Sequence, residues 1–102
     1  MNAWENIENP ETIQVRVRAL GILKALVTDP CISLTKGTSL SQLVDLLMKR
    51  YGKPFQEITL DPETNQINSF ICILLNGKIV GDLDEGLKGG DEVTLFIPVS
   101  GG

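Results

Sequence analysis

The chain has 102 residues, of which 42% are hydrophobic and 22% charged, and its formal net charge is −4. This length suits one domain that buries enough surface to fold by itself, and the composition is ordinary for a globular protein. The chain contains no histidine, the usual general base and the commonest metal ligand. We therefore expect no catalytic centre, no bound metal and no bound cofactor. The acidic balance argues against nucleic acid as a partner.

Two further features bear on the compartment. No apolar run approaches the ~18 residues needed to span a bilayer, so no membrane partner is expected. The first residues lack the basic region and the apolar core of a signal peptide. Cytoplasm is the default expectation.

The two cysteines, Cys31 and Cys72, form no C-x-x-C pair. Both lie in apolar, strand-like surroundings, where inert buried thiols are commoner than reactive ones. An iron–sulfur ferredoxin is excluded, since its cluster needs four thiolate ligands and the chain has two cysteines. We expect both cysteines to be structural.

The first half of the chain predicts two strands and one helix. Residues 1–11 are polar and acidic and are expected to form a loose leader. Residues 12–20 alternate apolar and polar, as a half-buried strand does, and residues 31–36 predict a second strand with Ile32 and Leu34 inward. A capping box from Ser39 to Gln42 then begins a helix over 39–51, which Gly52 ends and Pro54 prevents from continuing.

The second half predicts a loop and three strands. Residues 53–69 are expected to be a long loop with a turn-rich centre. The continuous apolar run 70–75 predicts a strand covered on both faces, and Asn76-Gly77 predicts a type I′ hairpin to a return strand. Residues 92–99 predict the final strand. The order favours an α+β fold, a mixed sheet with one main helix packed on one face.

The chain ends in Gly101-Gly102. Glycine has no Cβ, so such a pair can pass through a tunnel too narrow for any other residue. What it presents is a terminal carboxylate, which reacts only after conversion to a mixed anhydride such as an acyl-adenylate. This ending is typical of an activated carrier. The alternative is an ordinary frayed terminus.

Several segments of the chain resemble the MoaD/ThiS sulfur carriers, which have a ubiquitin-like β-grasp fold, and above all the small subunit of molybdopterin synthase. The segments are residues 20–23 (Leu-Gly-Ile-Leu), 37–43 (Gly-Thr-Ser-Leu-Ser-Gln-Leu), 75–77 (Leu-Asn-Gly), 87–93 (Leu-Lys-Gly-Gly-Asp-Glu-Val) and 96–102 (Phe-Ile-Pro-Val-Ser-Gly-Gly). Ile97 departs from the pattern, because these carriers often have a proline there. The resemblance implies a β-grasp domain over 12–99 and a tail over 100–102.

The resemblance also implies a reaction. An adenylyltransferase related to ubiquitin-activating enzymes would use ATP to adenylate the Gly102 carboxylate. Sulfur from a persulfide would then displace AMP and leave a Gly102 thiocarboxylate. The thiocarboxylate would donate sulfur to a pterin precursor in a larger synthase subunit, with Gly101 and Ser100 threading into the partner. In this scheme the chain is a protein cosubstrate and not a catalyst.

Two alternatives stay open. The same carrier chemistry could serve another acceptor, namely a thiazole, a cysteine, a tRNA or protein lysines as in ubiquitin-like modifiers. The domain could also be a β-grasp interaction module whose tail is never activated. The sequence does not identify the acceptor.

Strand alternation predicts a docking surface. In 92–99, Val93, Leu95 and Ile97 share the core face, so Phe96 points to the opposite face. If this strand lies beside the first, Phe96 is close to Arg16 and Arg18. An exposed aromatic residue flanked by arginines is typical of an interface, to which Pro98 and Val99 would also belong.

Two further observations are left with two interpretations each. Phe96 could be covered by Trp4 or another leader residue instead of a partner. Five acidic residues with one lysine, Lys88, precede the last strand, and they could dock on a basic protein or simply be solvated. These acids are Asp82, Asp84, Glu85, Asp91 and Glu92.

Overall fold

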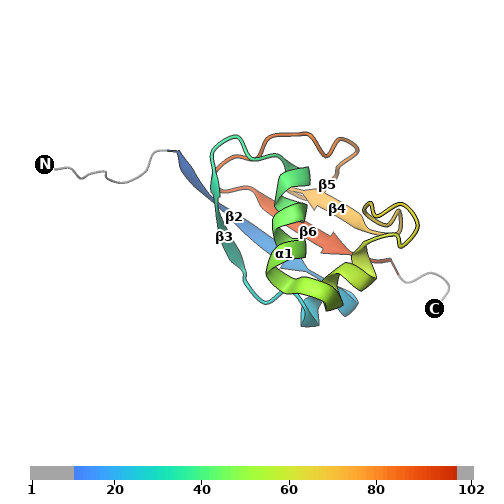
Figure 1. The fold of residues 1–102 in the computed structure, drawn as a ribbon. Helices are drawn as coiled ribbons and strands as arrows, with labels where there is room; N and C mark the ends of the chain where they lie inside the picture. Colours follow the sequence, from blue (N-terminus) through green and yellow to red (C-terminus); the bar gives the residue numbers. More distant parts are fainter. Residues whose placement is uncertain (1–10, 99–102) are drawn as a thin grey trace, which may run out of the picture.

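The computed structural model describes residues 11–98. Its elements in chain order are strand β2 (Thr12–Ala19), the short 3-10 helix η1 (Gly21–Ala25), strand β3 (Cys31–Thr35), helix α1 (Leu40–Thr59), and strands β4 (Cys72–Leu75), β5 (Lys78–Ile79) and β6 (Glu92–Phe96). Helix α1 crosses one face of a single sheet (Figure 1). The predicted α+β order of two strands, a helix and three strands is confirmed.

The last strand occupies the middle of the sheet. The five strands lie in the order β3-β2-β6-β4-β5. Strand β6 is parallel to β2, with Arg16 opposite Glu92 and Ala19 opposite Leu95, and antiparallel to β4. Because β6 has a hydrogen-bonded neighbour on each side, it has no free edge. The strand from which the C-terminal segment departs is therefore held on both sides.

The hairpin between β4 and β5 has the predicted turn. Asn76 and Gly77 both have positive φ, 53° and 86°. A type I′ turn requires this at both central positions, and its twist matches that of the strands it connects. The turn sets the register in which Leu75 lies opposite Lys78.

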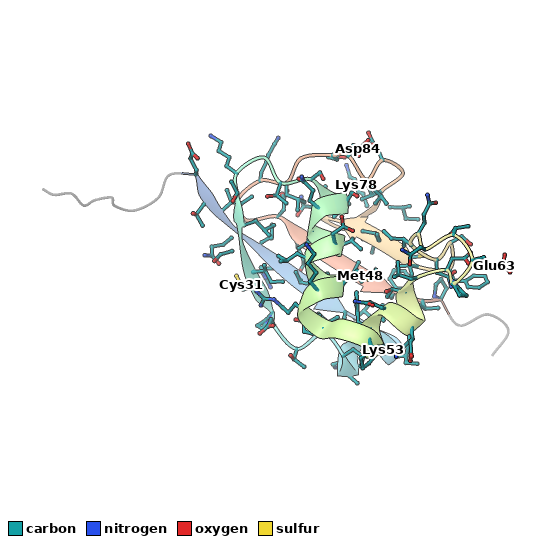
Figure 2. The ribbon with its side chains drawn as sticks, viewed as in Figure 1. Cys31, Met48, Lys53, Glu63, Lys78 and Asp84 are labelled. Carbon is teal, nitrogen blue, oxygen red and sulfur yellow. The ribbon has the colours of Figure 1, made fainter. Side chains whose placement is uncertain are left out.

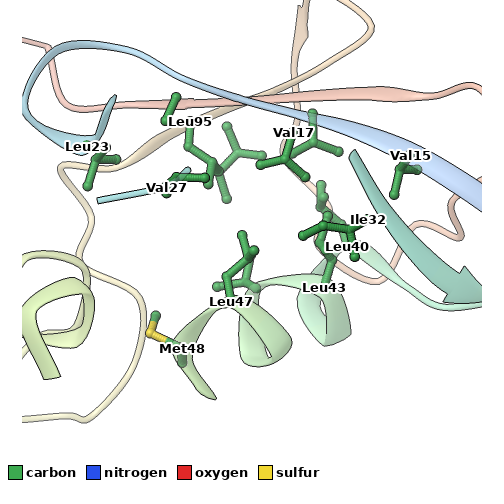
Figure 3. Packing of buried hydrophobic residues seen from close by; sticks show 14 of the residues in the cluster. Val15, Val17, Leu23, Val27, Ile32, Leu40, Leu43, Leu47, Met48 and Leu95 are labelled. Atoms are coloured by element: carbon green, nitrogen blue, oxygen red, sulfur yellow. The ribbon is translucent and has the colours of Figure 1, made fainter. Parts of the chain in front are cut away.

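The core lies between α1 and the sheet (Figure 3). It contains the inward residues of the strands and the apolar stripe of the helix, including Val15, Val17, Ile32, Leu34, Val93 and Leu95 from the sheet and Leu40, Leu43, Val44 and Leu47 from α1. Val15, Leu43 and Val93 are completely buried. Burial of each such side chain stabilises the fold by about 1.5–3 kcal/mol. The predicted inward positions of Ile32 and Leu34 are confirmed.

Helix α1 begins as the sequence predicts. Ser39 Oγ accepts a hydrogen bond from the Gln42 N–H at 3.1 Å, and Gln42 Oε1 accepts one from the Ser39 N–H at 2.9 Å. Both bonds of the capping box are present, so two N–H groups at the helix start are satisfied.

The predicted end of this helix at residue 51 is wrong in part. Gly52 does interrupt it, with φ 72° and ψ −152°, a combination open almost only to glycine. Helical structure resumes after this kink and continues to Thr59, so residues 53–59 are not a loop. Pro54 lies in the first turn of the second segment, where a missing N–H costs nothing. Phe55, only 1% exposed, buries this turn in the core.

The run 70–75 is also less buried than predicted. Strand β4 begins only at Cys72, and Phe70 before it is 68% exposed. Ile73 is 6% exposed and faces the core, while Leu74 is half-buried on the other face. No layer of the described residues covers that second face, so the run does not need to be buried on both sides.

A polar contact connects the loop before β3 to α1. Asp29 Oδ2 accepts hydrogen bonds from Arg50 Nη1 and from the Tyr51 hydroxyl, each at 3.0 Å. The Tyr51 oxygen in turn accepts the Asp29 N–H at 3.1 Å. The hydrogen bonds from Arg50 and Tyr51 lower the pKa of the Asp29 carboxyl below its ordinary value. The ionised carboxylate is therefore the form that holds this loop against the helix.

This contact predicts a pH-dependent contribution to stability. A carboxyl with a lowered pKa stabilises the fold above its unfolded pKa, and the contribution disappears as the pH falls through the folded value. Asp29→Asn should lower the free energy of unfolding near neutral pH, and the difference from the wild-type chain should shrink below about pH 4. Urea unfolding over a pH series measures this. In an Arg50→Gln, Tyr51→Phe background the same substitution should show no such pH dependence. A difference that stays constant from pH 7 to pH 3 would contradict the assignment.

Candidate docking face and tail exit

The chain leaves the sheet at the end of its central strand. After β6, Ile97 is half-buried against the core and Pro98 is exposed. The predicted site residues Val99, Ser100, Gly101 and Gly102 lie outside the described residues. The structure therefore gives the origin and surroundings of this segment.

The two faces of β6 alternate as predicted. Val93 and Leu95 are 0% and 2% exposed and face α1, and Ile97 continues on the same side. Phe96 lies opposite Cys72 of β4 on the other face, and it is half-buried. Phe96 is thus outside the core between helix and sheet.

We call the sheet face opposite α1 the open face, because no helix of residues 11–98 covers it (Figure 1). Its half around β4 and β5 is apolar: Leu74 stands opposite both Thr94 and Ile79, and Ile79 is 80% exposed. Leu20 continues β2 with an extended backbone, and its N–H bonds the Leu95 carbonyl, so it lies next to Phe96. The apolar half of the open face consists of Leu20, Cys72, Leu74, Ile79 and Phe96.

The half of the open face around β2 and β3 is polar and carries the two arginines. Arg18 stands opposite Thr94 and is a diagonal neighbour of Phe96, within reach of a long side chain. Arg16 stands opposite Glu92, with 3.8 Å between Arg16 Nη2 and Glu92 Oε2. The structure therefore brings Arg18 to Phe96, whereas Arg16 lies farther away against a carboxylate.

A hollow of about 530 Å³ lies where the chain leaves the sheet. Its lining residues are Ser69, Phe70, Cys72, Ile97 and Pro98. The segment before β4 supplies one wall and the segment after β6 supplies the other, and these two segments end at the same side of the domain in Figure 1. The exposed Phe70 ring therefore stands beside the start of the tail.

Sequence reasoning did not select Phe70 or Ile79 as site residues. Phe70, Cys72 and Leu74 occur at every second position, and this period of two would have placed them on one face. The uninterrupted apolar run concealed the alternation. Ile79 follows from the hairpin register, because it faces Leu74 across the Asn76-Gly77 turn.

The prediction that both cysteines are buried is wrong for Cys31. This residue is exposed and Cys72 is half-buried, and both thiols are free. Cys31 stands opposite Arg16, hence on the open face, and its Sγ donates a hydrogen bond to Gln14 Oε1 at 3.2 Å. Figure 2 shows it on β3 at the edge of the domain. Residues 11–98 hold no group of three or more metal-binding side chains.

The acidic cluster lies at the opposite end of β6 from the tail. Asp84 is drawn at the hairpin end of the sheet, near Lys78 (Figure 2). Two of the acids shape local turns: Asp91 accepts hydrogen bonds from the Lys88 N–H and Asn76 Nδ2, and Asp82 accepts one from the Asp84 N–H. At least these two carboxylates have a structural role, so the acidic character of this segment is not by itself a sign of docking.

Among the described residues, no helix is both long enough and apolar enough to cross a membrane. A search of curated protein sequences finds no significant match.

Solved structures of similar fold include archaeal and bacterial proteins. SAMP1 from Haloferax volcanii superposes with a TM-score of 0.72 at 22% identity, covering 87% of this chain and 99% of that one. A chain of the complex of subunits 1 and 2 of the molybdopterin-converting factor from Helicobacter pylori gives 0.58 at 24% identity, covering 88% and 100%. A chain of the BexX/CysO complex from Amycolatopsis orientalis gives 0.62 at 25% identity, covering 86% and 99%. The fold is therefore the ubiquitin-like β-grasp.

A family model provides the assignment that these structural likenesses do not. The model of the ThiS family matches residues 17–102. This range begins at Val17 in β2, contains α1 and β6, and ends at Gly101-Gly102. This chain therefore belongs to the ThiS family, the ubiquitin-like sulfur carriers.

Proposed function

We propose that this chain is the sulfur carrier of a molybdopterin synthase and that Gly102 is its activated residue. The proposal rests on the position of the end of β6. This strand is hydrogen-bonded to a neighbour on each side, and the segment that leads to Gly101-Gly102 leaves it beside an exposed apolar surface. A partner can bind that surface and receive the four residues after Pro98, which span at most ~14 Å. A carrier of this kind needs no catalytic side chain of its own, and the chain has no histidine.

The proposed conversion of the Gly102 carboxylate to a thiocarboxylate takes three steps on the partner enzymes. The Gly102 carboxylate attacks ATP, forming an acyl-adenylate and releasing pyrophosphate. A perthiolate of the sulfur donor then attacks the acyl carbon and expels AMP. A thiol cleaves the resulting acyl disulfide, leaving a thiocarboxylate and a disulfide. The adenylyltransferase binds the ATP, so the carrier itself holds no cofactor.

The choice of acceptor rests on the sequence resemblance. Phe96 and Pro98 followed by Gly101-Gly102 are similar to the ending of molybdopterin-type carriers, from which only Ile97 departs in this segment. Two of the similar structures are complexes, one of them of molybdopterin-converting factor subunits, which supports a larger partner subunit for this chain. Transfer to a thiazole, a cysteine, a tRNA or protein lysines is the second candidate. A reconstituted reaction with each acceptor, started from the thiocarboxylate form, distinguishes these cases.

The first prediction concerns Gly102. Incubation with the adenylyltransferase, ATP and a persulfide donor should replace one terminal oxygen by sulfur, which intact-mass analysis measures directly. The starting mass also shows whether Gly102 is the last residue of the protein. Deletion of Gly102, or one added residue beyond it, should abolish the increment while leaving the unfolding curve unchanged. A chain that never gains the increment with any activating enzyme would be a binding module only.

The second prediction concerns Gly101. A side chain here should clash with a narrow tunnel in the partner, so Gly101→Val should lose sulfur transfer while its stability stays close to that of the wild-type chain. Gly101→Ala is the graded control, expected to retain more activity than the valine variant. Full transfer by Gly101→Val would argue that this glycine supplies flexibility only.

The third prediction concerns Phe96. If Phe96 anchors a partner, Phe96→Ala should weaken binding to the activating enzyme or synthase subunit by about 2 kcal/mol or more. Phe55→Ala is the matched control, because that ring is buried in the core and its removal should cost the fold ~3–5 kcal/mol. Calorimetric binding and urea unfolding measure the two effects. A large stability loss with unchanged binding for Phe96→Ala would assign it a structural role.

A further inference from the structure

Strand β3 is one outer edge of the sheet, and its outward backbone groups have no partner among the described residues. The Val17 N–H bonds the Pro30 carbonyl at 3.0 Å, so in this antiparallel pair the even-numbered residues of β3 direct their backbone groups to β2. The backbone groups of the odd-numbered residues point away from the sheet. Within residues 11–98, no hydrogen bond engages the N–H groups of Cys31, Ser33 and Thr35.

Strand β3 also lacks the usual protection of a sheet edge. Proteins block exposed edges with charged side chains, prolines, bulges or very short strands. The five residues Cys31–Thr35 include no charge and no proline. By contrast, the opposite edge strand β5 has only two residues, one of which is Lys78. The β3 edge is therefore the better template for pairing with another strand.

We propose that β3 pairs with β3 of a second copy of this chain, antiparallel and about a two-fold axis at Ser33. In this register Cys31 of one copy lies opposite Thr35 of the other, so the whole strand is paired. The two Ser33 residues exchange N–H···O bonds, and each Thr35 N–H bonds the Cys31 carbonyl of the other copy. The outward pattern of β3 is thus complementary to itself, as an interface between identical chains requires.

The ends of the strand carry complementary charges in this register. Lys36 follows β3 and Asp29 precedes it, so Lys36 of one copy lies opposite Pro30 of the other, beside its Asp29 carboxylate. Both side-chain bonds that Asp29 accepts, from Arg50 and Tyr51, use Oδ2. Among the described residues no hydrogen bond to Asp29 Oδ1 is present, so this oxygen can accept the ammonium group of the second copy.

Charge also disfavours a shifted register. With the axis at Ser33, the two Lys36 residues are about 20 Å apart along the strands. With the axis at Thr35 they would be diagonal neighbours, about 7–8 Å apart, and would repel each other. That shift would also leave part of β3 unpaired. The register with full overlap is therefore the one that charge favours.

A groove beside β3 adds an apolar component to the contact. It has a volume of about 630 Å³ and lies between β3 and α1. Leu34 is buried at its base, and Leu46 of α1 is half-buried at its side. A two-fold axis at Ser33 sets the grooves of the two copies face to face, so each Leu46 loses exposure to water. A five-residue edge is only about 17 Å long, so we expect a weak, concentration-dependent dimer.

The pairing leaves the candidate docking surface free. Strands β2 and β6 separate β3 from β4 and β5, which carry the apolar half of the open face. The C-terminal segment departs from β6, so it is also away from the paired edge. Each copy can therefore still bind a partner through its open face. The inference does not depend on the proposed function.

Sedimentation equilibrium of the full chain under reducing conditions tests the pairing. The average mass should rise from 11.1 kDa toward twice that value as the concentration increases to roughly 1 mM. Ser33→Pro should raise the dissociation constant of the dimer by about tenfold or more, because it removes the central outward N–H and leaves every bond to β2. Ser33→Thr keeps this N–H and is the matched control, expected to dimerise like the wild-type chain. Circular dichroism confirms that each variant is folded.

Two further variants separate this edge from other surfaces. Lys36→Glu should weaken the dimer, because it places a carboxylate beside Asp29 of the second copy. Ile79→Asp changes an exposed residue on the open face and should leave the dissociation constant unchanged.

Disulfide trapping tests the register. In a chain whose native thiols are removed by Cys31→Ser and Cys72→Ser, Ser33→Cys should cross-link two copies on mild oxidation. The Cα atoms of directly opposite residues in a bonded pair are about 5.5 Å apart, within disulfide range. A chain that keeps only Cys31 should not cross-link through the paired edge, because its two sulfur-bearing residues lie about 14 Å apart along the strands.

Three results would overturn the proposal. One is an average mass that stays at that of the monomer up to roughly 1 mM. Another is a dimer that survives Ser33→Pro but is lost in Ile79→Asp, because the contact would then be on the open face. The third is efficient cross-linking through Cys31 together with none through Ser33→Cys, which would contradict the axis at Ser33.

Discussion

The pairing of the first and last strands in the middle of the sheet is the interaction on which the rest of the molecule depends. Arg16 to Ala19 run parallel to Glu92 to Leu95, and the inward residues Val17, Val93 and Leu95 are the layer on which α1 packs. A parallel pair cannot be closed by a hairpin, so the whole intervening chain, including the helix, acts as the crossover connection. The same pairing fixes the direction of β6. The C-terminal segment must therefore leave from the central strand, at the end of the sheet where β2 also ends.

The kink at Gly52 shows how this arrangement is completed at the tail end. The first segment of α1 covers the sheet, and the second turns so that Phe55 closes the core. Gln56 Nε2 bonds the Met48 carbonyl across the kink at 2.9 Å, and Thr59 Oγ1 bonds the Phe55 carbonyl at 2.7 Å. The first bond gives a partner to a carbonyl in the turn that Gly52 interrupts, and the second is an added side-chain bond from Thr59 to the carbonyl four residues before it. The loop after Thr59 then leads to Phe70, beside the exit of the tail.

Much of this architecture could be read from the sequence, where local chemistry and tertiary structure agree. The alternation of residues 12–20, the capping box at Ser39 and the Asn76-Gly77 turn each have a local cause, and each was placed correctly.

The errors arose where tertiary context decides. Pro54 ends a helix by local rules, yet it starts a second one here because Phe55 gains burial. The run 70–75 is apolar without being covered, because exposure depends on what lies on the other side of the sheet. Cys31 is exposed for the same reason, since an apolar neighbourhood in sequence does not specify the face. The strand from which the tail departs was predictable. The place of Phe70 and Ile79 near the site was not, because it depends on how β4 is paired with β5 and β6.

The distribution of surface chemistry differs between the two ends of β6. The apolar half of the open face adjoins the point where the chain leaves this strand. The acidic residues lie at the other end, where Asp82 and Asp91 hold local turns. The strand therefore places the start of the C-terminal segment beside an apolar surface and away from the acidic one. Because no helix of residues 11–98 covers the open face, a protein that binds there does not have to displace any part of the described domain.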